Sequence, residues 1–307
     1  MIMAMSTISS QAYASDPRND DVLIYVNGEF KKRNEATVSI FDSGFVLGDG
    51  IWEGMRLING KLLAIDAHMD RLFEGANSID LDLGMSRVDM IGIIRETLRV
   101  NDMHDGVHIR LMVSRGLKST PNQDPRFVLE GPTVVVVAEY KKIDEARKQK
   151  GIKLFTSTFR CSTPDVFDLR LNSHSRLNFI QALIQALHAG ADEALMLDSR
   201  GFVASCNSTN FFIVRKGEVW TSTGLCNFNG LTRKAVIDLA ASNGLVVREK
   251  DFTLAEVYSA EEAFVTGTLG GLTPVVCIDG RTIGTGEMGP AYRQLNAFYE
   301  AYLEETK

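Results

Sequence analysis

The chain has 307 residues, 45% of them hydrophobic and 23% charged, which is the composition of an ordinary globular protein. Its 33 basic and 39 acidic residues give a formal net charge of −6, which argues against a phosphate-backbone partner and leaves room only for a local basic site. No apolar run approaches the roughly 18 residues that a membrane helix needs, so we expect neither nucleic acid nor membrane among its partners.

Chain length and cysteine usage predict a two-domain cytoplasmic protein. A chain of 307 residues exceeds what one hydrophobic core usually serves. Its four cysteines are widely separated and form no CxxC pair, which favours reduced thiols in the cytoplasm. Residues 1–20 lack the basic and apolar regions of a signal peptide, and we interpret them as a flexible N-terminal tail.

The N-terminal half is predicted to contain two hairpins, two helices and two further strands. Asn27-Gly28 and Asn59-Gly60 each lie between strand-like segments, and Asn-Gly readily adopts a type I′ turn. Strands are expected at residues 107–114 and 132–140, and the second is apolar on both faces, which predicts a buried strand. The helices are predicted where apolar residues recur at helical spacing, first Met69, Leu72, Phe73 and Ala76, then Val88, Ile91, Ile94 and Leu98.

A charged stretch at residues 141–151 has no core-forming pattern and places the predicted domain boundary near residue 145. We therefore expect a small α/β domain over residues 21–145 and a larger α+β domain over residues 146–307. In the second domain a strand near residues 152–158 precedes a helix, and further helices are predicted at residues 232–243 and 290–305. The helix that follows this strand has one apolar stripe, formed by Leu177, Ile180, Ile184 and Leu187.

Two glycine-containing segments predict an anion site, although most generic enzyme signatures are absent. The sequence has no GxxxxGK[ST] loop, no GxGxxG turn after a strand and no metal-ligand spacing among its five histidines, so we expect no metal. In residues 227–236 a glycine and Thr232 come before a helix, whose first N–H groups attract an anion. In residues 264–274 glycines let the backbone approach a ligand, while Thr266 and Thr268 offer hydroxyl donors.

Residues 41–72, FDSGFVLGDGIWEGMRLINGKLLAIDAHMDRL, resemble the N-terminal signature of the class IV aminotransferases, which are fold-type IV enzymes that use pyridoxal phosphate (PLP). That family includes D-amino-acid and branched-chain aminotransferases and aminodeoxychorismate lyases. The resemblance implies a two-domain α+β fold of the D-amino-acid aminotransferase type, with the cofactor between the domains and a homodimer as the usual state. Further matches follow in the family's order as far as about residue 300, namely HIRLMVSRG, AGADEALMLDSRGFVASCNSTNFFIV, GLTRKAVIDLA, AFVTGTLGGLTPVVCIDGRTIG and MGPAYRQL.

The resemblance also implies which residues hold the cofactor phosphate. Arg71 would grip the phosphate, and its alternative role is that of a helix-surface arginine paired with Asp70 or Glu74. Backbone and hydroxyl donors would complete the cup, and they would come from Leu231, Thr232, Thr268 and Leu269.

The segment RLNSHSRLNF, residues 170–179, departs from the family pattern because it has no lysine. In the family a lysine three or four residues before an asparagine bonds covalently to PLP and then shuttles the substrate α-proton. Asn178 matches that asparagine, and Ser175 and His174 stand three and four residues before it. The segment is also longer than usual, so Asn172 is a third candidate for the lysine position.

A second departure lies at Ser205. The family has a V-x-E-G-[ST] motif whose glutamate pairs with the pyridine nitrogen of PLP and keeps that nitrogen protonated. The matching text is VASCNSTN, in which Ser205 replaces the glutamate and Cys206 the glycine. A serine can bond to a neutral pyridine but cannot hold a pyridinium. Two independent changes indicate a natural departure from the family's chemistry rather than one engineered mutation.

Three functional hypotheses follow. In the first, PLP or its amine form, pyridoxamine phosphate (PMP), is bound without a covalent anchor, and His174 replaces the lysine as general base with Ser175 and Arg176 beside it. In the second, a hydrolase or lyase independent of PLP uses the same residues, together with Cys206, on an anion that Arg71 holds. In the third, the chain is a non-catalytic binding paralogue.

Substrate-binding residues are expected around Trp52 and in the loop RGLKSTPNQDPR. Trp52 stands where the family usually has Tyr or Phe, and we expect it to line and narrow the pocket. The loop offers Arg115, Lys118 and Arg126 to a substrate carboxylate, which predicts a small anionic substrate. The alternative is a solvated basic loop.

Overall fold

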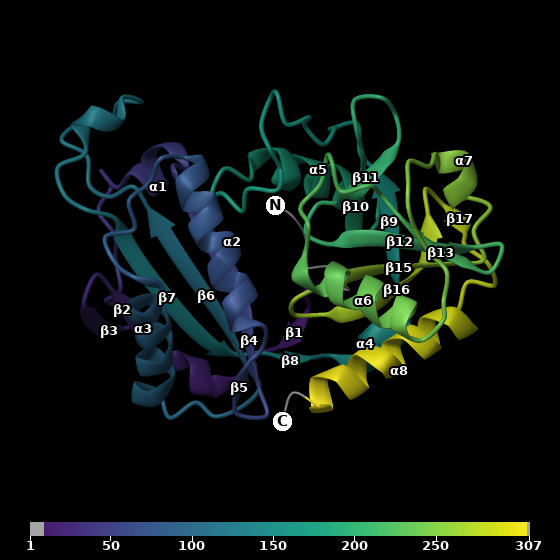
Figure 1. The fold of residues 1–307 in the computed structure, drawn as a ribbon, viewed down its shortest axis with the longest axis horizontal. Coiled ribbons are helices and arrows are strands. Elements are labelled where there is room, and N and C mark those ends of the chain that lie inside the picture. Colours follow the sequence, from purple (N-terminus) through teal and green to yellow (C-terminus); the bar gives the residue numbers. More distant parts are fainter. Residues whose placement is uncertain (1–8, 306–307) are drawn as a thin grey trace. The chain divides into compact units, whose positions relative to one another are not determined.

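The computed structural model describes residues 9–305, without the side chains of residues 146 and 147, and divides into two compact units (Figure 1). The N-terminal unit comprises Ser15–Lys142 and Leu171–Arg176. The C-terminal unit comprises residues 9–14, Ile143–Arg170 and Leu177–Glu305. One short segment of the chain, Leu171–Arg176, therefore belongs to the N-terminal unit although it follows Ile152–Thr156, a strand of the other unit.

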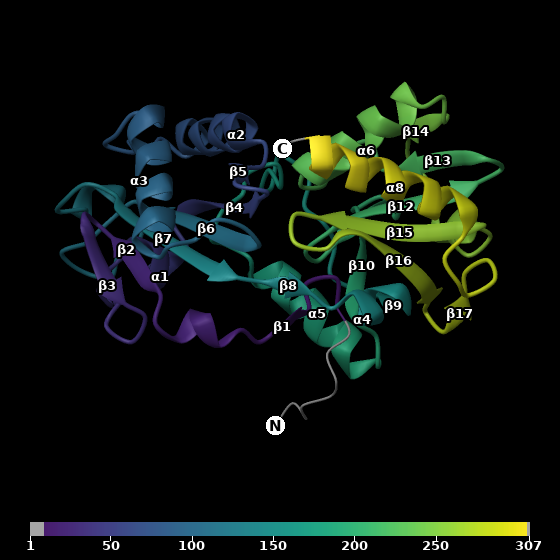
Figure 2. The same cartoon turned by 90° about the horizontal axis from the view of Figure 1, so that it is seen from below.

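The N-terminal unit is built on an antiparallel six-stranded sheet of order β3-β2-β7-β6-β4-β5. Two helices cover one face of it (Figure 2): α2 (Ile65–Ser78) contacts β4, and α3 (Arg87–Val100) contacts β7 and β2. Between helices and sheet lies a core that includes Met55, Met69 and Ile94. The strands are β2 (Leu23–Val26), β3 (Glu29–Lys32), β4 (Gly50–Ile58), β5 (Lys61–Leu62), β6 (Val107–Ser114) and β7 (Thr133–Tyr140), and the short helices are η1 (Pro17–Asp20), α1 (Ser43–Leu47) and η2 (Pro125–Phe127).

Local sequence signals in this unit are confirmed. Both Asn-Gly pairs turn a hairpin with positive φ at each residue, 45° and 94° at Asn27 and Gly28, and 52° and 77° at Asn59 and Gly60. Both helices and both long strands occur where the apolar spacing predicts them. The prediction that residues 132–140 are buried on both faces is wrong, because only alternate residues of β7 are fully buried.

The C-terminal unit contains a mixed nine-stranded sheet, which runs β11-β10-β9-β16-β15-β12-β13-β14 with β17 paired to β16. Helix α5 (Leu177–His188) packs on β9 and β10, while α6 (Leu231–Ser242) and α8 (Pro290–Glu305) pack on β15 and on each other. The strands are β9 (Ile152–Thr156), β10 (Glu193–Leu197), β11 (Val203–Cys206), β12 (Asn210–Arg215), β13 (Glu218–Thr221), β14 (Val247–Glu249), β15 (Glu262–Gly267), β16 (Gly271–Ile278) and β17 (Arg281–Thr282); the short helices are α4 (Glu145–Gln149) and α7 (Leu254–Val257).

Helix α5 buries a different face from the apolar stripe. Leu177, Ile180 and Ile184 are 67%, 52% and 38% exposed, whereas the buried side chains are the smaller Ala182 and Ala186 together with Phe179. Small residues allow the helix to approach β10 closely, so the larger side chains are left on the outer face.

The N-terminal segment (residues 9–14) is packed against the fold. The predicted tail over residues 1–20 falls partly outside the described residues, but Ser10 and Asn19 within it are buried. Strand β1 (Tyr13–Ala14) pairs with β8 (Lys142–Ile143) in a two-stranded sheet. Residues 9–20 are therefore not a frayed tail.

No helix within residues 9–305 is long and apolar enough to cross a membrane.

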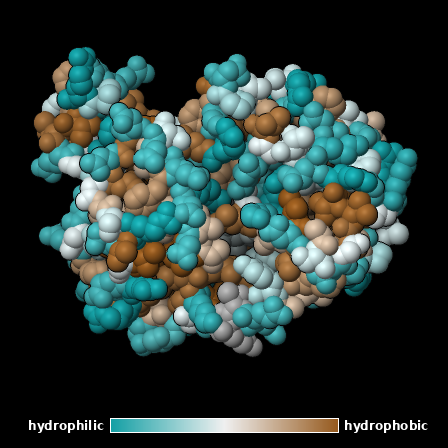
Figure 3. Space-filling view, viewed as in Figure 1, coloured by the Kyte–Doolittle hydropathy of each residue, from teal (hydrophilic) through white to brown (hydrophobic). Residues whose placement is uncertain are grey.

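An exposed apolar surface surrounds α1 in the N-terminal unit, and we call it the α1 patch. It consists of Ile40, Phe41, Phe45, Phe127 and Leu129, with Ile40 69% and Phe45 71% exposed. Backbone hydrogen bonds from Lys118 to Phe41 and from Leu129 to Leu117 hold the contributing segments side by side. Figure 3 shows apolar side chains in this area, at the upper left, over α1 and the loop after β6.

Candidate functional site

The lysine-free segment Leu171–Arg176 lies along β4 as a short extra strand. The N–H of Trp52 donates to the carbonyl of Asn172, and the N–H of His174 donates to the carbonyl of Gly50, each at 2.9 Å. Ile51 and Ser173 form an antiparallel bridge between these bonds. The indole N–H of Trp52 adds a bond to the carbonyl of Ser173 at 3.0 Å. Trp52 therefore holds the segment at its centre.

The three candidates for the lysine position differ in their surroundings. Asn172 is buried, and its amide N–H donates to the Trp52 carbonyl at 2.6 Å, while its Oδ1 has no partner among the described residues. The His174 Nδ1 lies 3.2 Å from where a Cβ on Gly44 or Gly50 would be, so the ring is packed against backbone. Ser175 is exposed and donates to the Gly48 carbonyl at 3.1 Å.

His174 has a lowered pKa in this position. Burial lowers the pKa of its imidazole, and a backbone hydrogen bond at Ile51 and the charge of Asp42 oppose this effect only in part. Its Nε2 is buried without a partner among the described residues. We therefore expect a neutral imidazole at pH 7 that packs between β4 and α1.

Arg71 is held by a buried carboxylate. Its Nε and one terminal nitrogen donate to the two oxygens of Glu53 at 2.8 and 2.6 Å, and the His68 Nδ1 lies 2.7 Å from Glu53 Oε2. Burial alone would raise the pKa of Glu53, but the bonds from Arg71 and His68 outweigh it and the pKa lies below its usual value. Asp70, one of the two alternative partners with Glu74, pairs with Arg87 at 2.6 Å.

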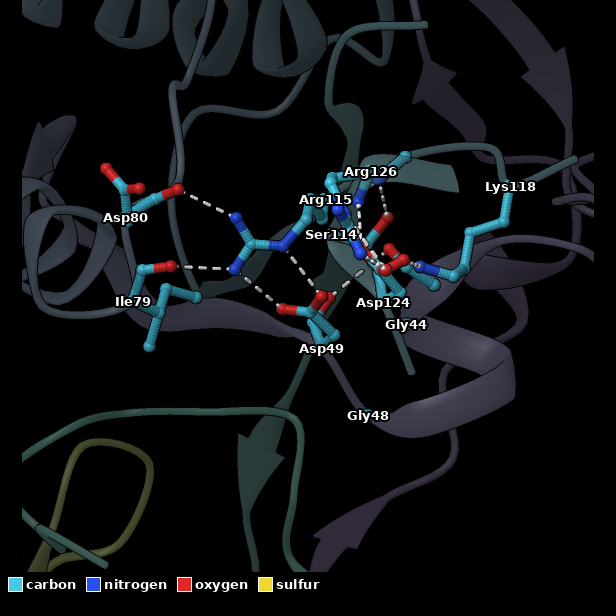
Figure 4. A network of polar contacts seen from close by, with 12 residues as sticks. Gly44, Gly48, Asp49, Ile79, Asp80, Ser114, Arg115, Lys118, Asp124 and Arg126 are labelled. Carbon is cyan, nitrogen blue, oxygen red and sulfur yellow. Dashed lines mark hydrogen bonds and ion pairs between the residues drawn. The ribbon is translucent and has the colours of Figure 1, made fainter. Parts of the chain in front are cut away.

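The predicted substrate arginines have protein partners of their own (Figure 4). Arg115 bonds Asp49 through two nitrogens, at 2.7 and 3.1 Å, and reaches the carbonyls of Ile79 and Asp80 at 2.7 Å each. Arg126 pairs with Asp124 at the surface. Lys118 is only 2% exposed and donates to the Asp124 carbonyl at 3.1 Å. A substrate-binding role for Arg115 and Arg126 stays a prediction.

Trp52 is also flanked by cations. The guanidinium of Arg110 lies 3.7 Å from the ring centroid and that of Arg176 lies 5.9 Å away. Burial lowers the pKa of Arg110, and the charge of Glu53 opposes that effect. The guanidinium of Arg110 therefore covers the indole ring in a cation–π contact.

The predicted phosphate cup gathers at one end of the C-terminal unit's central strands. Helix α6 begins at Leu231 after Gly230, a residue without a side chain to cap the first N–H groups. A Cβ on Gly230 would lie 2.4 Å from Asn210 Oδ1, which accepts the Gly230 N–H at 3.2 Å. Asn210 is paired across the sheet with Thr266, whose buried hydroxyl has no partner among the described residues. Thr268 and Leu269 follow in the turn after β15.

Ser205 is buried beside this cup and is already hydrogen-bonded. Its hydroxyl donates to the Thr209 carbonyl at 2.9 Å and accepts from the Asn210 amide at 3.4 Å. The neighbouring Cys206 is buried, and burial raises the pKa of its thiol well above the usual value, which favours the unreactive protonated form.

The sequence interpretation missed two buried carboxylates. Glu53 positions Arg71, and Glu193 accepts the Thr209 hydroxyl at 2.8 Å. In the sequence Glu193 opens the apolar run EALML, and an acidic residue at the start of a fully buried strand was the available signal.

Comparison of the chain with known proteins agrees with this architecture. Residues 50–278 match the family model of amino-transferase class IV. The chain is 38% identical over 290 residues to branched-chain-amino-acid aminotransferase-like protein 1 of Arabidopsis thaliana, covering 94% of this chain and 52% of that protein, so it spans about half the length of this relative. It is 32% identical over 280 residues to a D-alanine aminotransferase of Listeria monocytogenes, covering 90% and 94%.

A solved structure gives the same assignment. The T.th. branched-chain amino acid aminotransferase, crystallised with pyridoxamine 5'-phosphate, superposes with a TM-score of 0.84 at 30% identity and covers 92% of this chain and 95% of its own. The fold is therefore the α+β fold of the fold-type IV enzymes, and the chain belongs to the class IV aminotransferase family.

Proposed function

We propose that this chain binds PLP or PMP without a covalent bond and acts on a small amino or keto acid. The observation that carries the proposal is the polar cup of the C-terminal unit, where the buried hydroxyl of Thr266 lacks a partner among the described residues next to the uncapped start of α6. Buried polar atoms are rarely left unpaired, and a helix start attracts anions, so the cup fits a phosphate. When bound, such a cofactor supplies an electron sink.

The second element of the proposal is that Asn172 stands at the family's lysine position. Its support is a buried amide whose Oδ1 is unpartnered within residues 9–305, whereas Ser175 is exposed and His174 packs against backbone. An amide neither bonds covalently to an aldehyde nor carries a proton at neutral pH. We therefore propose that transamination is slow, and that any proton transfer falls to a group other than Asn172, with His174, Ser175 and Arg176 as the candidates nearest in the chain.

A lysine scan tests this assignment. Asn172→Lys is expected to make the cofactor fixable by borohydride and to raise transaminase turnover, while His174→Lys and Ser175→Lys are not. Borohydride fixation is read by mass spectrometry of the peptide that carries residue 172. Fixation in Ser175→Lys but not in Asn172→Lys would place the family's lysine at Ser175 and overturn this element alone.

The cofactor itself is tested by the absorbance of the purified protein. Visible absorption that borohydride bleaches without attaching the cofactor to the chain is the expected result for bound PLP. A protein that is colourless and stays colourless with added PLP contradicts the proposal. The substitution Thr266→Val, which removes the unpaired hydroxyl at nearly constant volume, should weaken PLP binding about tenfold through a lost charge-assisted hydrogen bond. Thr282→Val, at an exposed position in β17, is the matched control.

A non-catalytic binding function is the second candidate. It is favoured by Ser205, which stands at the position of the family's glutamate and has no carboxylate. The Ser205 hydroxyl donates to the Thr209 carbonyl, so its hydrogen is not free for a ligand. The cofactor-independent hydrolase or lyase is less favoured, because burial leaves Cys206 protonated. Turnover of amino acids by the loaded protein separates the candidates.

The relatives narrow the substrate only to amino acids and their keto acids, since they include proteins named for branched-chain amino acids and for D-alanine. We also propose a homodimer. The exposed α1 patch is an apolar surface of the kind that partners cover. Sedimentation of the wild type and of Phe45→Asp tests this, with dissociation expected for the variant.

A further inference from the structure

The N-terminal segment is attached to the C-terminal unit by a buried carboxylate. Both the N–H of Ser10, at 3.1 Å, and its hydroxyl donate to Oε1 of Glu193, which lies 183 positions away in the sequence. Ser10 is 5% exposed and Glu193 1% exposed. A carboxylate held out of water by neutral donors depends on each of them.

The other oxygen of Glu193 continues the contact towards Ser205. Oε2 accepts the hydroxyl of Thr209 at 2.8 Å, and the carbonyl of Thr209 accepts the hydroxyl of Ser205 at 2.9 Å. Ser205 in turn accepts from Asn210, which also receives the N–H of Gly230. An unbroken series of hydrogen bonds thus runs from Ser10 to the start of α6.

The N-terminal segment also lies against the loop that carries Thr268 and Leu269. A Cβ on Gly270 would be 2.4 Å from the Ser10 carbonyl oxygen, and one on Gly267 would be 3.2 Å from Nε2 of Gln11. These two glycines flank Thr268 and Leu269, the predicted phosphate contacts of the cup loop. The N-terminal segment therefore touches this loop on both sides of Thr268 and Leu269. Their lack of side chains is what permits the close approach.

We propose that Ser10, acting through Glu193, is a positioning residue for the cofactor-binding end of the C-terminal unit. This inference rests on the proposed function, since the end it positions is the proposed phosphate cup. Ser10 fixes Glu193, Glu193 fixes the Thr209 hydroxyl, and the Thr209 carbonyl orients Ser205. A chain that lost the N-terminal segment would keep its sheet but lose the support of the cup loop.

Hydrogen exchange in the cofactor-free protein tests the positioning. Ser10→Ala removes the hydroxyl donor, and amides of residues 203–210 and 266–272 are expected to exchange about tenfold faster, as the loss of a hydrogen bond to a charged group implies. Ser9→Ala is the matched control, because the Ser9 hydroxyl accepts only from the Gln11 N–H among the described residues. It should leave both regions unchanged. Faster exchange confined to residues 9–14 would overturn the inference.

Cofactor binding gives the second readout. Ser10→Ala should raise the dissociation constant of PLP, measured by absorbance titration, about tenfold, and Glu193→Gln should have a smaller effect because its amide can still accept from Ser10. Unchanged PLP affinity in Ser10→Ala would overturn the inference even if exchange is faster. Wild-type protein that binds no PLP would instead refute the proposed function, while the exchange experiment would still decide whether Ser10 supports residues 203–210.

Discussion

Glu53 in the N-terminal unit and Glu193 in the C-terminal unit are the two most deeply buried glutamates of the described residues, and they are stabilised in opposite ways. Glu53 of the N-terminal unit is 0% exposed and is paired with Arg71 and His68. Glu193 of the C-terminal unit is 1% exposed and has hydroxyl and N–H donors from Ser10 and Thr209. Burial alone would raise the pKa of Glu53, but the bonds from Arg71 and His68 outweigh it and lower the pKa. Burial raises the pKa of Glu193, and its donors offset this only in part.

The difference indicates what each residue does. A carboxylate that accepts two bonds from an arginine fixes the guanidinium in one charged orientation. A carboxylate with neutral donors fixes the polar groups around it without adding a positive charge. Glu53 therefore positions a charge and Glu193 positions hydroxyl groups.

The largest expected effect is on stability when the ion pair is broken. Glu53→Gln leaves Arg71 and His68 partly unpaired in the interior and should lower the free energy of unfolding by about 3–5 kcal/mol. Glu193→Gln keeps the volume and removes no cation's partner, so a loss of about 1–2 kcal/mol is expected. An equal loss in both variants would contradict the distinction.

Two tryptophans make the measurement specific for each unit. Trp52 lies in the N-terminal unit and Trp220 in the C-terminal unit, and they are the two tryptophans of the chain. Urea unfolding followed by fluorescence in a Trp220→Phe background reports the N-terminal unit, and a Trp52→Phe background reports the other. Separate readouts matter because two units need not unfold in one step.

The second prediction concerns pH. Because the folded pKa of Glu53 is below its usual 4.5, its contribution to stability is complete above pH 4.5 and is lost as the pH falls. Because the folded pKa of Glu193 is raised above 4.5, its contribution is complete below pH 4.5 and is lost as the pH rises.

The gap in unfolding free energy between wild type and Glu53→Gln should therefore grow as the pH rises towards 4.5. The gap between wild type and Glu193→Gln should shrink as the pH rises above 4.5. Each gap changes by about 1.4 kcal/mol for every pH unit that separates the folded and unfolded pKa values. Unfolding midpoints in urea provide the check, measured below pH 4.5 for Glu53→Gln and above pH 4.5 for Glu193→Gln. Two gaps that both grow, or both shrink, as the pH rises would refute the opposite assignments.

The smallest effect is expected from a single hydroxyl. Thr209→Val removes one donor to Glu193 at nearly constant volume and should cost about 1 kcal/mol of unfolding free energy in the C-terminal unit. Thr221→Val is a suitable control, since its buried hydroxyl donates to the Phe211 carbonyl rather than to a carboxylate. If both variants lose the same free energy, the charge on Glu193 adds nothing to its bond with Thr209.

Local patterns predicted the elements well because the signals lie within a few residues of one another. Asn59-Gly60 turns its hairpin through its own backbone preference, and α2 occurs where Met69 and Leu72 recur. Pattern alone failed for α5, since helical spacing marks an apolar stripe but does not tell which face meets the sheet. In α5 the face that meets the sheet is the one with small residues such as Ala182.

The site was harder to predict because its contacts span long stretches of sequence. The segment Leu171–Arg176 was placed by pairing with residues about 120 positions earlier, and Ser10 meets Glu193 across 183 positions. The family pattern points to Thr232 and Thr268 and to a segment without lysine, and these assignments stay predictions. It does not point to Glu53 or Glu193, because neither carboxylate belongs to the motifs that carry the resemblance.

The return of Leu171–Arg176 to the N-terminal unit has a consequence for synthesis on the ribosome. The unit cannot complete the hydrogen bonding of β4 until residue 176 has emerged from the exit tunnel, although its other strands are available once residue 142 has emerged. A nascent chain paused between these points would expose the backbone of Gly50 and Trp52 as an unpaired strand edge, which is a template for association with other chains.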